Sequence, residues 1–102
     1  PEALVQAAYR ALGRNALAGA GDLLGAIEQA MDAEEDAAAR TELGGRLAAY
    51  RGELAGFAEM VESGEPAPTE QWRQMTSRLG EMRLELDRVI WEARLSALIS
   101  TI

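Results

Sequence analysis

The chain has 102 residues, of which 48% are hydrophobic and 26% charged, and its net charge is −7. These values predict a single folded domain over residues 1–102 and exclude a chain that is disordered by composition. The sequence contains no Cys, His or Lys, which excludes disulfides, thiolate and imidazole metal ligands, and Schiff-base chemistry. No apolar run approaches the roughly 18 residues that a membrane span needs.

Two features of the composition concern the source of the chain. All ten basic residues are Arg, and Ala is abundant, which predicts a bacterial protein, and without a visible signal peptide we expect a cytoplasmic one. The sequence starts at Pro1 instead of Met, so we expect a fragment or a trimmed chain.

Apolar residues recur with the helical period along almost the whole sequence, and no alternating run of period two is present. The pattern therefore predicts an all-α fold, a small bundle of about four helices with a long C-terminal helix. The first helix is expected to end near Gly13, and Asp22 is expected to cap the second after Gly19 and Gly21. The four helices are predicted near residues 2–13, 22–38, 42–62 and 70–101.

The third predicted helix has the clearest apolar stripe, with spacing 4-3-4-3-4. Its members are Leu43, Leu47, Tyr50, Leu54, Phe57 and Val61. Thr41 is the expected N-cap and Gly64 the expected C-cap. Four glycines in this helix are interpreted as sites where another helix approaches closely: Gly44, Gly45, Gly52 and Gly56.

The segment 63–68 contains Gly64 and two prolines and predicts a stiff loop. Thr69 is then expected to cap the last helix, which only Gly80 interrupts and which would be roughly 50 Å long. Together with the third helix it should form one core cluster. The predicted core residues are Leu47, Tyr50, Leu54, Phe57, Trp72, Leu79, Met82 and Leu86.

The last helix has two nearly opposite apolar faces. The first spans most of its length, and the second is confined to its C-terminal half. A helix with two apolar faces must be covered on both sides. Two coverings remain open for the second face: the first helix folds back over it, or a second copy or another protein packs there. The predicted interface residues are Leu84, Trp91, Leu95, Leu98 and Ile102.

The negative charge is concentrated in residues 15–39, which carry six acidic residues and no basic one. Such a surface disfavours nucleic acid as a partner. The predicted acidic face comprises Glu28, Asp32, Glu34, Glu35 and Asp36. Asp32, Glu34 and Asp36 have the spacing of the first three ligands of a calcium-binding loop. Ala37 and Leu43 stand where that loop needs Gly and Glu, so no metal site is expected.

These observations favour a non-enzymatic helical domain for oligomerisation, such as a homodimer, or for protein–protein interaction, as in an adaptor or regulator. The domain would dock through its C-terminal helix, without cofactor. One alternative is an acidic inhibitor or decoy that occupies a basic surface of another protein. A second alternative is a regulatory domain that senses a ligand in a pocket between its helices.

Overall fold

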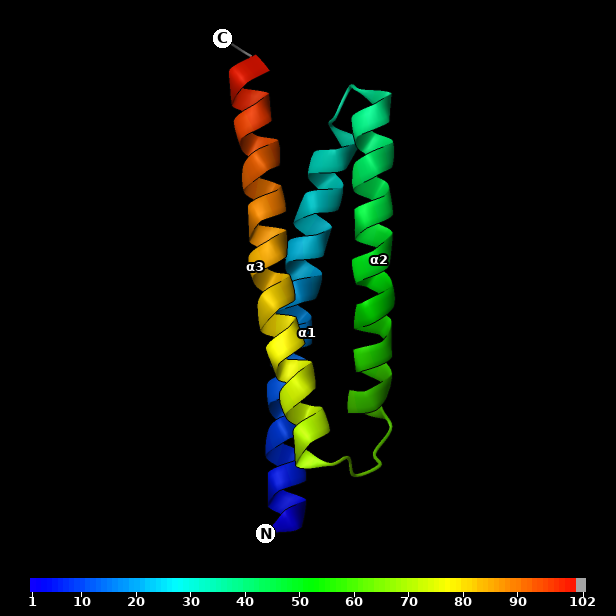
Figure 1. Ribbon diagram of the computed structural model, residues 1–102, viewed down its shortest axis with the longest axis vertical. Helices are drawn as coiled ribbons and strands as arrows, with labels where there is room; N and C mark the ends of the chain where they lie inside the picture. Colours follow the sequence, from blue (N-terminus) through cyan, green and yellow to red (C-terminus); the bar gives the residue numbers. More distant parts are fainter. Residues whose placement is uncertain (101–102) are drawn as a thin grey trace.

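The computed structural model describes residues 1–100, apart from the side chains at positions 97 and 100. The described chain forms three helices: α1 (Glu2–Asp32), α2 (Ala37–Glu62) and α3 (Thr69–Ser100). They follow an up-down-up course, so α1 and α3 run in the same direction and α2 runs against both (Figure 1). The bundle is elongated, with extents of 58 × 20 × 17 Å. The all-α class is thus confirmed, with three helices instead of about four.

The expected break between residues 13 and 22 is wrong, because α1 continues through it. Gly13 is buried where α1 meets the other two helices. A Cβ atom at this position would lie 2.7 Å from Met75 Cε and 3.0 Å from Val61 Cγ2. A side chain at position 13 would have to displace Met75 or Val61, so glycine favours close packing between the helices here. The same residue type that often ends a helix allows this one to approach its neighbours.

The boundary between α1 and α2 also differs from the prediction of a helix over 22–38. The helix ends at Asp32, and a short turn leads to Asp36, the N-cap of α2. The Asp36 carboxylate accepts a hydrogen bond from the Ala38 amide at 3.0 Å, as N-cap residues do. Thr41, the expected cap, lies inside α2, where its hydroxyl donates to the Ala37 carbonyl.

The predicted loop over 63–68 is confirmed, and Gly64 has a φ of 73° directly after the last turn of α2. Two side chains of α1 fasten this loop. Gln6 donates to the Ala67 carbonyl and accepts from the Ala67 amide, while Arg10 donates to the carbonyls of Val61 and Glu65. The hydrogen bonds connect the start of α1 to the point where α3 begins.

The core is built around α1, which packs along both α2 and α3, whereas α2 and α3 approach each other less closely. The buried residues form two clusters instead of the single one expected. One contains Leu24, Ile27, Leu47, Met82, Leu86, Val89 and Ile90. The other contains Val61, Trp72, Met75 and Leu79. Tyr50, Leu54 and Phe57 are only partly buried, and Leu54 and Phe57 contact both clusters.

The glycines of α2 do not have the packing role that the sequence suggested. A Cβ atom would meet nothing within 4 Å at Gly45, Gly52 or Gly56, and only Met31 Sδ, at 3.7 Å, at Gly44. The close approaches involve glycines of α1 instead, because α1 is the helix between the other two. The expectation for α2 is therefore wrong.

Candidate functional site

The C-terminal half of α3 presents two faces with different surroundings. Its inner face is buried against the core, as Leu86 (0% exposed) and Val89 (3%) show. We call the opposite side of this half the outer stripe, which consists of Leu84, Trp91, Leu95 and Leu98. These residues are 72%, 61%, 49% and 62% exposed, respectively. Four of the five residues predicted for the interface thus lie together on an exposed surface, and the fifth, Ile102, lies outside the described residues.

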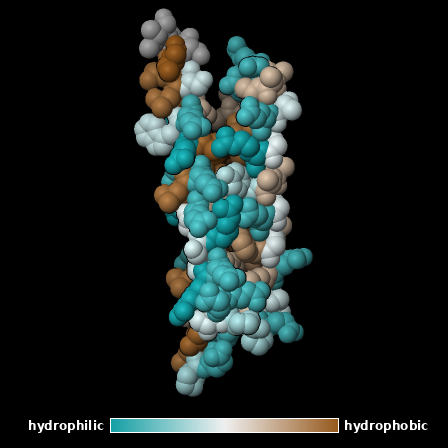
Figure 2. Space-filling view, in the orientation of Figure 1, coloured by the Kyte–Doolittle hydropathy of each residue, from teal (hydrophilic) through white to brown (hydrophobic). Residues whose placement is uncertain are grey.

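The outer stripe stays exposed because α1 packs on the other side of α3. The alternative that the N-terminal segment folds back over Trp91 is therefore wrong. Ile99, 69% exposed, lies beside the stripe and enlarges it. Apolar side chains gather along the α3 edge of the molecule, most densely where the last turns of α3 rise past the turn between α1 and α2 (Figure 2).

A smaller group of exposed apolar side chains lies on the first turns of α1. It consists of Leu4, Val5 and Leu12, which are 75%, 38% and 57% exposed. This group is at the opposite end of the bundle from the last turns of α3 (Figure 1). The outer stripe is therefore the larger of the two exposed apolar surfaces, and it contains the exposed tryptophan.

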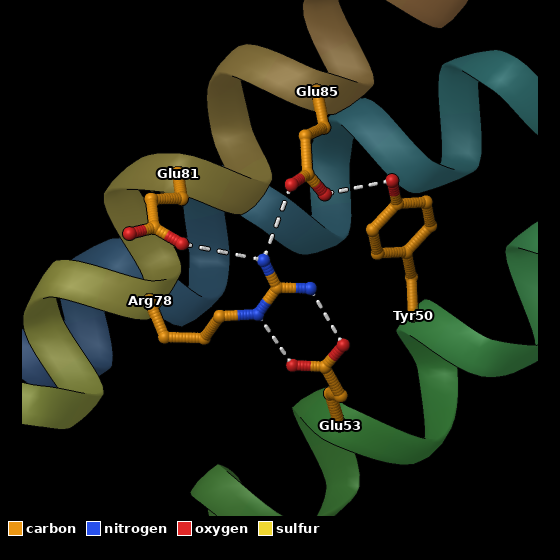
Figure 3. A network of polar contacts seen from close by, with 5 residues as sticks. All are labelled: Tyr50, Glu53, Arg78, Glu81 and Glu85. Carbon is orange, nitrogen blue, oxygen red and sulfur yellow. Dashed lines mark hydrogen bonds and ion pairs between the residues drawn. The ribbon is translucent and has the colours of Figure 1, made fainter.

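A polar network on one flank of α3 connects this helix to α2 (Figure 3). Arg78 makes two hydrogen bonds to the Glu53 carboxylate, at 2.6 and 2.7 Å. Arg78 also contacts Glu85 at 3.2 Å and Glu81 at 3.6 Å. The hydroxyl of Tyr50 donates to Glu85 at 2.8 Å. One guanidinium group thus bridges helices whose backbones are not close together.

The network shifts the pKa values of its members in the directions that its contacts dictate. The bonds from Arg78 lower the pKa of Glu53, and the bond from Tyr50, followed by the contact with Arg78, lowers the pKa of Glu85. Partial burial and the bond to Glu85 raise the pKa of the Tyr50 hydroxyl. Near neutral pH these groups stay in the charge states that hold α2 against α3.

A second polar cluster surrounds Trp72, the first large side chain of α3. The indole Nε1 donates to Gln6 Oε1 at 2.7 Å, and Tyr9 stacks on the ring with 6.3 Å between the centroids. Arg10 lies over the same ring, 5.5 Å from its centroid. Gln6 is buried with its amide satisfied, as buried polar groups require. This cluster holds the first turn of α3 against α1.

The residues of the predicted acidic face lie in the last turns of α1 and in the turn that follows it. Glu28 lies on α1 and contacts Arg51 of α2, whereas Glu34 and Asp36 lie in the turn. There Glu34 accepts a hydrogen bond from the Asp36 amide, and Asp36 caps α2. Because α1 ends at Asp32, these five residues are divided between the helix and the turn, whereas the predicted helix over 22–38 would have contained all of them.

The hollows between the helices are open grooves. One of about 500 Å³ lies between α2 and α3, with Phe57, Met60 and Arg78 among its lining residues. Over residues 1–100, no group of acidic side chains is placed to hold a metal ion. None of the described helices is long and apolar enough to cross a membrane. Comparisons with known proteins found no matching family model, curated protein or solved structure.

The two polar clusters are the structural features that the sequence did not reveal. Gln6 and Trp72 are 66 residues apart, and Arg78 and Glu53 are 25 apart. A regular spacing identifies neighbours within one helix, but it says nothing about which polar side chains of two helices meet. The one available signal was the position of Gln6 and Arg10, four residues apart at the start of α1.

Proposed function

We propose that this chain is a non-enzymatic helical domain that docks onto another protein chain through the outer stripe of α3. The observation that carries the proposal is the exposure of Trp91 in a row with Leu84, Leu95 and Leu98. Large contiguous apolar surfaces on soluble proteins usually mark interaction sites. Tryptophan is also enriched among the residues that dominate the binding energy of interfaces.

The continuity of the presenting helix supports the same function. α3 is continuous from Thr69 to Ser100, and its first half is held by the Trp72 cluster and by the bridge from Arg78 to Glu53. A partner would therefore meet a surface that is already formed, which reduces the ordering cost of association.

The chemistry of the described residues favours binding over catalysis. An effective general acid or base at neutral pH has a pKa near 7. The contacts around Glu53 and Glu85 instead move the pKa values of these carboxylates downward. Glu53 is bound by Arg78, and Glu85 by Arg78 and Tyr50. The chain has no His or Lys, so its serine and threonine hydroxyls lack the bases that most often activate such nucleophiles.

The proposal is tested by the mass of the protein in solution, measured by sedimentation over roughly 1 µM to 1 mM. We expect the mass of the wild type to rise above the 11.0 kDa of one chain. The double variant Leu95→Glu/Leu98→Glu should stay at one chain, because it would place charges in a dry interface. A matched control is Ala48→Glu/Ala49→Glu, which adds the same charge to an exposed part of α2 and should associate like the wild type.

A wild type that stays at the mass of one chain over the whole range would contradict the self-associating form of the proposal. Equal association by the wild type and the Leu95→Glu/Leu98→Glu variant would place the contact on a different surface. Circular dichroism of both variants checks that their helices are intact.

A further inference from the structure

We infer that the outer stripe pairs with the same stripe of a second copy of this chain, the two α3 helices crossing antiparallel at Trp91. The inference rests on the proposed function and specifies its partner. Three properties of the described residues support it: the placement of the apolar side chains about Trp91, the order of the charges beside the stripe, and the exposed area.

The apolar residues are placed symmetrically about Trp91. Leu84 and Leu98 each lie seven residues from it, in opposite directions along the helix. A two-fold axis at Trp91 therefore brings Leu84 opposite the partner's Leu98, and Leu98 opposite the partner's Leu84. Leu95 then fits between the partner's Leu84 and the partner's Trp91. The same patch contacts itself, as in an isologous dimer.

The charges beside the stripe are ordered for the same arrangement. At about 100° per residue, Arg88 and Glu92 lie on one flank of the stripe and Asp87 and Arg94 on the other, and all four are exposed. An antiparallel two-fold pairing places each flank against its own copy in reverse order. Arg88 then approaches the partner's Glu92, and Asp87 approaches the partner's Arg94. Symmetry doubles each contact. On the flank of Arg88 the two Glu92 side chains also lie about 3 Å apart along the axis, so the complementary flank is that of Asp87 and Arg94, where like charges are separated by at least about 9 Å.

The position of Arg88 distinguishes the antiparallel pairing from a parallel one, because the charges on the two flanks would also meet opposite charges in a parallel pair. Of the flanking charges, Arg88 lies nearest the stripe, because its spacing to Leu84 and Trp91 is the 4-3 spacing of a helix–helix seam. In a parallel pair in register, Arg88 would face the partner's Arg88 within that seam. Two guanidinium groups at one level would repel each other. Antiparallel pairing about Trp91 separates them by about 9 Å along the helix axis.

The exposed area is sufficient for a pair of copies. From their exposed fractions, the outer stripe and Ile99 present roughly 600 Å² per chain. Complete burial of both patches would remove up to about 1,200 Å² from water, which reaches the lower end of the range for specific interfaces. The stripe lies nearly opposite the face that packs on α1, so the two bundles would sit on opposite sides of the α3 pair.

The orientation is tested by cross-linking, because the chain has no cysteine of its own. Two variants, Leu84→Cys and Leu98→Cys, are prepared separately, checked for association by sedimentation, and oxidised alone and as a mixture. We expect disulfide-linked dimers mainly in the mixture, where residue 84 of one chain meets residue 98 of the other. Trp91→Cys, at the crossing point, should cross-link by itself.

Charge reversal provides a second test that needs no oxidation. Asp87→Arg should weaken association by about tenfold, because it places like charges opposite each other twice in the dimer. Adding Arg94→Asp in the same chain should restore most of the loss. Residues 87 and 94 of one chain are two helical turns apart, too far to form an ion pair with each other. Restored association would therefore show that residue 87 of one chain contacts residue 94 of the other.

The outcomes separate this inference from the proposed function. A dimer in which Leu84→Cys cross-links by itself as well as in the mixture would contradict the antiparallel pairing and leave docking through α3 in place. The same holds for a dimer that the second charge reversal does not restore. A wild type with the mass of one chain at all concentrations contradicts both the second copy and the self-associating form of the proposed function.

Discussion

The two apolar faces of α3 are similar in composition and opposite in environment. The inner face includes Trp72 and Leu86, both fully buried, and the outer stripe includes Trp91 and Leu84, which are 61% and 72% exposed. Leu84 and Leu86 are two residues apart on one helix. The difference between them arises from the position of α1, which packs along one side of α3 only. An apolar stripe thus predicts that a helix face will be covered, and the fold decides whether the chain itself covers it.

The largest expected effect contrasts these two leucines. Leu86→Ala should lower the free energy of unfolding by about 2–5 kcal/mol, because it opens a cavity in a closed core. Leu84→Ala should change it by no more than about 0.5 kcal/mol when the protein is dilute. Urea denaturation at low protein concentration measures both. Similar losses for the two variants would show that the outer stripe belongs to the core of the single chain.

A second contrast tests how α1 reaches the inner face. Gly13→Leu should cost about 1–3 kcal/mol, because its side chain would overlap Met75 and Val61. Gly21→Leu, at a position with nothing within 4 Å, should stabilise the helix by about 0.5–1 kcal/mol. Thermal and chemical denaturation give the sign of each change. A stable Gly13→Leu variant would mean that α1 and α3 are not in close contact there.

The smallest expected effect on the free energy of unfolding comes from the ion pair by which Arg78 bridges α2 and α3. The pKa of Glu53 lies below its ordinary value of 4.5 in the folded protein. The stabilisation that its charge provides is therefore present above pH 4.5 and disappears as the pH falls through the lowered pKa. At pH 7 Glu53→Gln should cost no more than about 1 kcal/mol, since the pair is partly exposed to solvent.

Denaturation of the Glu53→Gln variant and the wild type at several pH values checks this dependence. The two curves should converge below pH 4.5. Glu81→Gln serves as the control, because its carboxylate is 64% exposed and 3.6 Å from Arg78. A difference between wild type and Glu53→Gln that stays constant down to pH 2 would show that the Arg78 contact does not depend on the charge of Glu53.

Much of the fold was predictable from the sequence because α3 and its neighbouring loop carry unambiguous local signals. The prolines and Gly64 mark the loop, and the apolar period of α3 separates Trp72 and Leu86 from Trp91. The continuity of α1 through the predicted break at Gly13 was not predictable in the same way. Glycine at position 13 is compatible both with the end of a helix and with close packing, and only the neighbouring side chains decide between them.

In the candidate site, too, the features that depend on one helix were predictable and those that depend on how the helices pack were not. The exposed residues of the outer stripe were predictable, because they follow from helical periodicity within one element. The helix that covers the inner face was not, and α1 takes the place expected for residues 42–62. The contacts of Gln6 and Arg78 depend on how separate helices are placed, and apolar periodicity carries no information about them.

The exposure of Trp91 provides the most direct test of docking through the outer stripe. The chain has two tryptophans, of which Trp72 is buried and Trp91 exposed, so acrylamide quenching of the wild type reports mainly on Trp91. We expect the quenchable fraction of the fluorescence to fall as the protein concentration rises, and to stay constant in the Leu95→Glu/Leu98→Glu variant. Unchanged quenching of Trp91 in the wild type from micromolar to millimolar concentration would contradict burial of the stripe by a second copy.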